Sequence, residues 1–125
     1  MKKKYKVLLL EIDEIVEEEV VVFVQGKAVK CFVSYCPFDI EVGKEYAAEF
    51  DLDLPDFDCV ESAKLPAKQV EILGQGFSCV VSGYLDGTTF RSFVDFNNME
   101  LHYDYPKLNE TYVSVRVNRI NIDFG

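Results

Sequence analysis

The stretch EYAAEFDLDL, from Glu45 to Leu54, decides the fold class of this chain. Its apolar and acidic side chains alternate with a period of two, which is typical of a β-strand with one buried and one solvated face. The apolar face holds Tyr46, Ala48, Phe50, Leu52 and Leu54. The outer face holds Glu45, Glu49, Asp51 and Asp53, with Ala47 as the exception. The stretch therefore predicts a half-buried strand that presents four carboxylates to solvent.

Three earlier segments also have the composition of strands. Residues 4–12, KYKVLLLEI, are apolar on both faces in their middle and predict a central strand that is covered on both sides. Residues 18–24 and 27–35 are rich in β-branched and aromatic residues, and Gln25-Gly26 between them is a two-residue hairpin signal. We therefore expect four strands in the first half of the chain.

The second half repeats this layout after a shift of 61 residues. VVVFVQGKAVKCFVSY, residues 20–35, then aligns with VSGYLDGTTFRSFVDF, residues 81–96. The turn glycine Gly26 falls on Gly87, which belongs to the stronger hairpin signal Asp86-Gly87. We expect a single domain over residues 1–125, with two similar halves at 4–54 and 67–124 and a polar, proline-containing linker at 55–66.

The end of the chain leaves two arrangements open. Val113, Val115 and Val117 share one parity, whereas Ile120, Ile122 and Phe124 share the other. A β-bulge near Asn118-Arg119 would keep all six side chains on one face. Alternatively, the strand crosses at this point from one sheet to another.

Together, these patterns predict an all-β fold of about eight strands with little helix. A closed barrel or a two-sheet sandwich would protect the edges of the strands. The order of the expected strands, with a long buried first strand followed by a hairpin, resembles an OB-like Greek-key barrel over roughly two thirds of the chain. This resemblance concerns the fold alone and implies a small β-barrel.

The four cysteines, Cys31, Cys36, Cys59 and Cys79, raise the question of a metal knuckle, a redox pair or a nucleophile. In a continuous strand Cys31 and Cys36 would lie on opposite faces and about 16 Å apart, too far for a disulfide or a shared metal ion. A zinc site would also need a second closely spaced pair of ligands, which the sequence lacks. We expect reduced structural thiols, no metal and no cofactor, with Cys36 at a strand end as the candidate reactive thiol.

The segment LHYDYP, residues 101–106, contains the only histidine. His102 is a candidate general base oriented by Asp104, but no nucleophile motif accompanies it, and we expect no enzymatic activity. Tyr103 and Tyr105 are candidate partner contacts, because loops carry function and tyrosine is enriched at interfaces. The alternative is that these rings cap one end of a barrel.

The formal net charge is −9, from 22 acidic and 13 basic residues. Phosphate would repel such a chain, which argues against nucleic acids and anionic membranes and favours a basic protein partner or simple solubility. Acidic residues concentrate in residues 11–19 and 41–61, and one side of the protein is strongly negative if the fold gathers both stretches. The apolar run before Glu11 is too short for a signal or membrane segment, so we expect a cytoplasmic protein.

Two functions compete on these grounds. In the first, a basic protein binds to an acidic and aromatic surface formed by Glu45, Glu49, Asp51, Asp53, Tyr103 and Tyr105. In size and charge the chain is similar to small acidic bacterial proteins that block nucleic-acid-cleaving toxins. In the second, an OB-like module binds an oligonucleotide or another ligand through aromatic strand residues, namely Phe32, Tyr35, Phe90, Phe93 and Phe96. The small number of basic residues on those strands disfavours the second function.

Overall fold

The computed structural model describes residues 3–56 and 58–125. It is all-β apart from one short α-helix, α1 (Met99–Asp104), and one turn of 3-10 helix, η1 (Pro106–Leu108). The strands within the described residues are β1 (Tyr5–Ile12), β2 (Glu19–Val24), β3 (Lys27–Tyr35), β4 (Glu45–Asp53), β5 (Val60–Ser62), β6 (Gln69–Ile72), β7 (Cys79–Asp86), β8 (Thr89–Arg91), β9 (Asp95–Asn97), β10 (Thr111–Val117) and β11 (Arg119–Phe124). The predicted all-β class is confirmed, although eleven strands exceed the expected eight.

The additional strands have three sources. Strand β5 lies in the segment that was expected to be a linker. The return strand of the second hairpin breaks after Arg91, and β9 folds back on β8 so that Phe96 lies opposite Phe90. The last strand ends at Val117 and resumes at Arg119 as β11. Alternation did not reveal the break after Arg91, because apolar side chains continue on both sides of it, whereas the change of parity after Val117 marked the break at Asn118.

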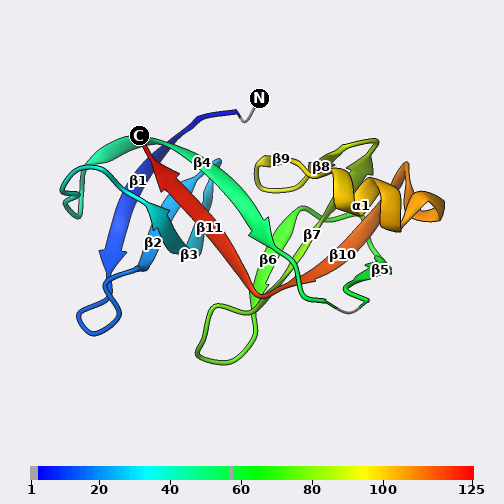
Figure 1. The fold of residues 1–125 in the computed structure, drawn as a ribbon, viewed down its shortest axis with the longest axis horizontal. Coiled ribbons are helices and arrows are strands. Elements are labelled where there is room, and N and C mark those ends of the chain that lie inside the picture. Colours follow the sequence, from blue (N-terminus) through cyan, green and yellow to red (C-terminus); the bar gives the residue numbers. More distant parts are fainter. Residues whose placement is uncertain (1–2, 57) are drawn as a thin grey trace.

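Strands β1, β2, β3, β11 and β4 close into a five-stranded barrel, which occupies the left half of Figure 1. Neighbouring strands are antiparallel, except that β3 and β11 run parallel. Apolar side chains from all five strands fill the interior, among them the buried Leu9, Val22, Val29, Leu52 and Ile122. Closure gives each of the five strands a neighbour on both sides over part of its length, which leaves little of the open edge that an isolated sheet would present.

A second sheet contains β5, β10, β7, β8 and β9 in that order, and β6 also pairs with β7. It lies beside the barrel in Figure 1 and is in direct contact with it. The ring of Phe93 packs edge-on against Phe50 of β4, with 5.7 Å between ring centres. The hydroxyl of Tyr5 in β1 accepts a hydrogen bond from the backbone N–H of Asp95 at 2.9 Å. The buried residues of barrel and sheet consequently form one hydrophobic cluster.

The chain passes from the second sheet to the barrel at Asn118. Strand β10 pairs with β7, whereas β11 pairs with β3 and β4. Of the two arrangements that the change of parity left open, the crossing between sheets is therefore the one that forms. The backbone N–H of Asn118 donates to the carbonyl oxygen of Asp53 at 2.8 Å, and the Arg119 side chain lies 3.2 Å from the Asp53 carboxylate. These contacts fix the crossing against the end of β4.

Both hairpins that suggested an internal repeat are present. Gly26 and Gly87 occupy their turns with φ angles of 80° and 61°, a region that favours glycine. The hairpins differ beyond Arg91, because β8 ends there whereas β3 continues to Tyr35. The similarity of the two halves stays a prediction, although the final strand of the second half completes the barrel of the first.

We predict that Gly83→Ala destabilises the protein. A Cβ atom at Gly83 in β7 would press against the backbone carbonyl of Arg91 in β8, and backbone atoms cannot move aside as a flexible side chain can. The free energy of unfolding, measured by urea denaturation, should fall by about 1–3 kcal/mol.

Gly76→Ala is the matched control, because a Cβ atom at Gly76 meets open space. The control should change the free energy of unfolding by less than about 0.5 kcal/mol. Wild-type stability in Gly83→Ala would contradict the close approach of β7 and β8.

Candidate functional site

The outer face of β4 carries the acidic side chains expected there, while the alternate apolar side chains from Ala48 onward turn inward and are buried. Strand β11 lies beside β4 and places Asp123 opposite Glu49 and Asn121 opposite Asp51. Like charges directly opposite each other on neighbouring strands are destabilising unless a cation lies nearby. The sheet thus adds Asp123 to the acidic face that the sequence predicted.

Among the predicted carboxylates on β4, Glu45 and Asp53 form ion pairs. Glu45 lies 3.4 Å from the ammonium group of Lys6, and both side chains are well exposed. Asp53 pairs with Arg119 at the crossing into β11. Exposed pairs of this kind contribute at most about 1 kcal/mol, so neither removes the negative character of the face. Asp53 nevertheless has a structural role in addition to its charge.

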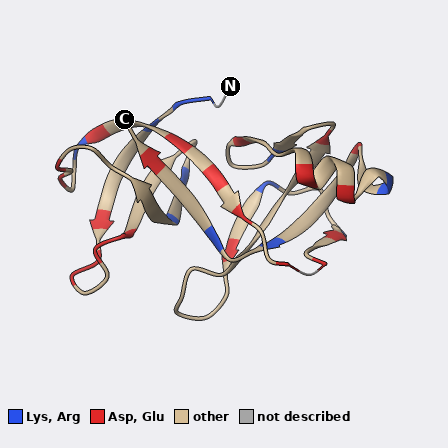
Figure 2. Cartoon of the chain, viewed as in Figure 1, with Lys and Arg blue, Asp and Glu red and all other residues tan. Residues whose placement is uncertain are grey.

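A groove connects the acidic face of β4 with helix α1. One hollow of about 340 Å³ and a second of about 360 Å³ adjoin each other, because Leu54 and Glu100 line both. The carboxylates that line this β4–α1 groove are Asp51, Asp53, Asp56, Asp58, Glu100 and Asp104. Figure 2 shows acidic residues on β4, on the segment after it and on α1. Two parts of the chain that are far apart in sequence, β4 with the segment after it and helix α1, therefore contribute negative charge to one concave surface.

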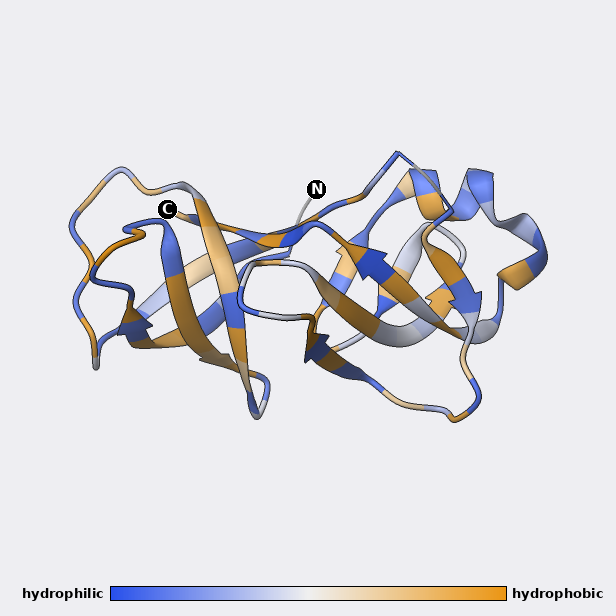
Figure 3. Ribbon diagram, turned by 90° about the horizontal axis from the view of Figure 1, so that it is seen from below, coloured by the Kyte–Doolittle hydropathy of each residue, from blue (hydrophilic) through white to orange (hydrophobic). Residues whose placement is uncertain are grey.

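Helix α1 is short and largely hydrophilic, as Figure 3 shows, and the buried Leu101 holds it against the core. The side-chain oxygen of Asn98 accepts a hydrogen bond from the N–H of Leu101 at 3.1 Å and caps the first turn. Glu100 and Asp104 are four residues apart, so they lie on the same side of the helix. The expected loop is thus a helix here, and Glu100 was not among the predicted site residues, although an asparagine three residues before Leu101 is a helix-start signal.

The two predicted tyrosines have different environments. The hydroxyl of Tyr105 accepts a hydrogen bond from the N–H of Cys59 and donates one to the Asp58 carboxylate, both at 3.1 Å. Tyr105 thereby fixes the segment after β4 and lines the groove. Tyr103 is 67% exposed and packs edge-on against His102.

The structure therefore gathers three of the six predicted contact residues around the β4–α1 groove, namely Asp51, Asp53 and Tyr105. The other three, Glu45, Glu49 and Tyr103, do not line it. Acidic residues of β1, β2 and the turn between them line a separate hollow.

Most of the aromatic residues considered for ligand stacking belong to the core. Phe90, Phe93 and Phe96 are buried, so the expectation that they form an open aromatic face is wrong. They are buried because β9 folds back on β8 and brings their rings together against the barrel. Tyr35 is exposed and Phe32 is half-buried.

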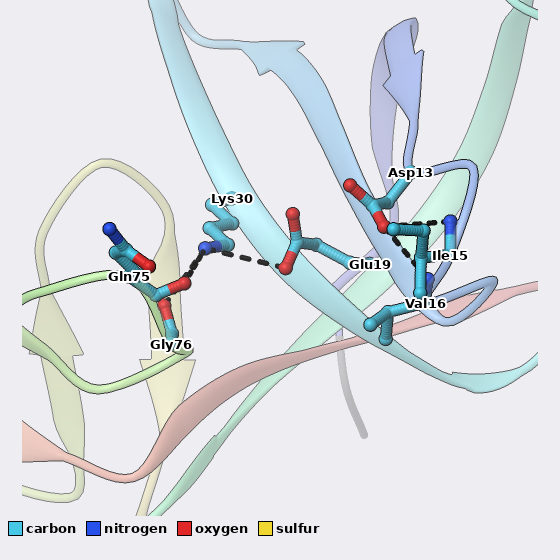
Figure 4. Close-up of polar contacts among 7 residues, drawn as sticks. All are labelled: Asp13, Ile15, Val16, Glu19, Lys30, Gln75 and Gly76. Atoms are coloured by element: carbon cyan, nitrogen blue, oxygen red, sulfur yellow. Dashed lines mark hydrogen bonds and ion pairs between the residues drawn. The ribbon is translucent and has the colours of Figure 1, made fainter.

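The loop between β6 and β7 covers Phe32. The ring of Phe77 packs edge-on against the Phe32 ring, with 5.5 Å between ring centres. The ammonium group of Lys30 donates hydrogen bonds to the backbone carbonyls of Gln75 and Gly76, both at 2.9 Å, as Figure 4 shows. The part of the outer face of β3 around Lys30 and Phe32 is thus covered by another part of the same chain.

All four cysteines are free thiols. Cys31, Cys59 and Cys79 are buried, and the half-buried Cys36 directs its sulfur toward the carbonyl oxygen of Phe38 at 2.9 Å. Burial raises the pKa of Cys31 and raises the pKa of Cys79 to about 11. Both thiols therefore stay protonated near neutral pH, and a protonated thiol is a poor nucleophile.

The remaining polar residues include His102, the candidate general base. The Nδ1 atom of His102 is buried without a hydrogen-bond partner among the described residues, so no contact at this atom orients the ring toward Asp104. Within residues 3–56 and 58–125, no group of three or more His, Cys, Asp or Glu side chains is arranged to hold a metal ion. In the described part of the chain, no helix has the length and apolar character needed to cross a membrane.

These features define an all-β protein in which a closed barrel shares its core with a second sheet. The chain belongs to the family described as uncharacterised conserved protein UCP019853, whose model matches residues 2–125. No curated protein and no solved structure matches the chain. The geometry and charge of the groove are therefore the basis for assigning a function.

We predict that the stability of the protein falls as the pH rises from about 9 toward 11. Burial raises the pKa of Cys79 from 9.0 to about 11, so the unfolded chain loses this proton at a lower pH than the folded chain does. The stabilisation linked to this thiol is complete below the unfolded pKa and is lost as the pH approaches the folded pKa. Urea denaturation of wild type and Cys79→Ala over this range should show a shallower decline for the variant.

Val81→Ala provides the control, because it truncates another buried side chain of β7 that does not titrate. It should lower stability without changing the slope against pH. Identical slopes for wild type and Cys79→Ala would contradict a buried, protonated thiol.

Proposed function

We propose that the protein is a non-enzymatic, cytoplasmic protein-binding module whose β4–α1 groove receives a positively charged segment of a partner protein. The observation that carries this proposal is the convergence of six carboxylates on one groove. A concave surface lined by one sign of charge concentrates the field and raises the rate at which an oppositely charged partner arrives.

The distribution of the carboxylates favours an extended basic segment as the ligand. They line two adjoining hollows rather than pointing at a single centre, so one small cation would meet only part of them. Several lysine or arginine side chains along a peptide would offset the repulsion among neighbouring carboxylates. Tyr105, which bonds to both Cys59 and Asp58, preorganises one wall and reduces the entropy lost on binding.

The size and charge of the chain suggest the kind of partner. Small acidic bacterial proteins that block nucleic-acid-cleaving toxins are similar in both respects. The surface of such a toxin is basic because it binds phosphate. A groove rich in carboxylates attracts such a basic surface as phosphate does, so it competes with the nucleic acid for the toxin.

Neutralising the groove should slow association with a basic ligand. The triple variant Asp56→Asn, Glu100→Gln, Asp104→Asn removes three groove charges and nearly preserves side-chain shape. With a fluorescent decalysine peptide as the probe, the association rate at low salt should fall by about tenfold. The difference should shrink as salt is added, because exposed charges are screened over about 8 Å at physiological ionic strength.

The control variant Glu17→Gln, Glu71→Gln, Glu110→Gln removes the same charge from exposed positions outside the groove. The association rate of this control variant with decalysine should fall much less than that of the groove variant. Equal losses in the two variants would mean that only net charge matters, and the groove would then have no specific role.

A second candidate function is an OB-like module that binds an oligonucleotide or another ligand on β2 and β3. The closed five-stranded barrel resembles an OB fold, in which the face of the second and third strands binds ligands. The guanidinium group of Arg119 lies 4.0 Å from the centre of the Phe32 ring, an arrangement suited to stacking a base. Phe77 already covers this ring, and the net charge opposes phosphate, so we favour the first function.

Phe77→Ser tests the second candidate by uncovering Phe32. If the face binds bases, the affinity for oligothymidine in a low-salt anisotropy titration should rise by about tenfold or more over wild type. Phe38→Ser, which alters an exposed phenylalanine elsewhere, should leave the affinity unchanged. An absence of binding by wild type and by Phe77→Ser would exclude oligonucleotide binding on this face.

A further inference from the structure

A third hollow lies at one end of the barrel, between the β1–β2 turn and the β3–β4 turn. Its volume is about 470 Å³, and none of its lining residues belongs to the β4–α1 groove. Its apolar lining consists of Ile12, Ile15, Val21 and Val42. Its acidic lining consists of Glu11, Asp13, Glu14 and Glu19. This barrel-end hollow therefore combines an apolar surface with negative charge.

Two of its apolar side chains are strongly exposed. Ile15 is 91% exposed and Val42 is 57% exposed, and they come from different turns. Single exposed apolar residues are ordinary on protein surfaces. Here, however, two of them line the same concavity as the half-buried Ile12 and Val21. An apolar centre with polar residues around it is the composition of a docking surface.

The turn that presents Ile15 is held in place by hydrogen bonds. The Asp13 carboxylate accepts hydrogen bonds from the N–H groups of Val16 at 2.7 Å and Ile15 at 3.0 Å, as Figure 4 shows. These two bonds lower the pKa of Asp13 and keep it negatively charged. The N–H of Asp13 also donates to the carbonyl oxygen of Glu19 at 2.9 Å. Because the turn is already ordered, little conformational entropy is lost when a partner covers it.

The opposite turn is anchored to the same strand. The N–H of Gly43 donates to the carbonyl of Leu9 at 2.8 Å, and the N–H of Leu9 donates to the carbonyl of Lys44 at 3.0 Å. Beyond this contact, Glu11 and Ile12 pair with β2 on one edge and with no described strand on the other. An extended peptide can lie along such an edge and place alternate side chains into the hollow.

We infer that the barrel-end hollow docks a short extended segment of a partner protein in which apolar and basic residues alternate. The apolar side chains of this segment cover Ile15 and Val42, and its basic side chains face Glu11 and Glu14. A second copy of this chain is a poor occupant, because each copy carries a net charge of −9. This inference concerns a surface separate from the β4–α1 groove and does not depend on the function proposed for it.

A fluorescent peptide of alternating leucine and lysine is the probe for this hollow. The double variant Ile15→Ser, Val42→Ser should bind it at least about tenfold more weakly than wild type, because two apolar contacts are lost. Both positions are exposed, so the variant should keep the wild-type circular dichroism spectrum. A second variant, Glu11→Gln, Glu14→Gln, should weaken binding at low salt and have little effect at about 0.5 M salt.

Leu65→Ser is the matched control, because Leu65 is 75% exposed and does not line the hollow. It should bind the alternating peptide as wild type does, and so should the triple groove variant at about 0.5 M salt, where the groove charges are screened. The inference is overturned if the peptide does not bind wild type, or if Ile15→Ser, Val42→Ser binds it unchanged. Loss of binding in the groove variant alone would assign the peptide to the β4–α1 groove and would also overturn the inference.

Discussion

The insertion of β11 between β3 and β4 is the constraint on which the rest of the structure depends. Four strands from the first half of the chain form most of a ring, and β11 supplies the parallel pair with β3 and the antiparallel pair with β4 that complete it. The crossing residues Val117 and Ile120 are buried on either side of Asn118. Because β10 and β11 are continuous through this point, closing the barrel also sets the position of the second sheet. The β4–α1 groove exists only because these two parts are held together.

Strand alternation was sufficient to predict β4, because one face meets the core and the other meets water along its whole length. The change of parity after Val117 was also visible, but a bulge and a crossing both keep the apolar side chains buried. Only the pairing of β11 with strands from the other half distinguishes them. The bend after Arg91 could not be recognised from the alternation of apolar residues, because Phe93 and Phe96 are apolar whether the strand continues or folds back.

The acidic strand face was likewise visible in the sequence, whereas the groove beside it was not. Glu100 and Asp104 reach the groove because α1 packs near the end of β4. A contact between segments this far apart in sequence cannot be recognised from the residues of either segment alone. Tyr103 and Tyr105 looked equivalent as members of a loop. They differ because residue 105 lies just beyond the end of α1, where it turns back to Asp58 and Cys59, while residue 103 faces outward on the helix. Burial of Phe90 likewise depends on a fold-back, because β9 brings Phe96 against it.

The late position of β11 has a consequence for synthesis on the ribosome. Asn118 contacts Asp53 across 65 residues of sequence, so β3 and β4 emerge with one unpaired edge each, well before their partner is made. At about 5–20 residues per second, this interval lasts several seconds. An unpaired edge invites pairing with a strand of another nascent chain. The carboxylates along β4 oppose such pairing by mutual repulsion, and the same residues that give the folded surface its charge therefore protect the chain during translation.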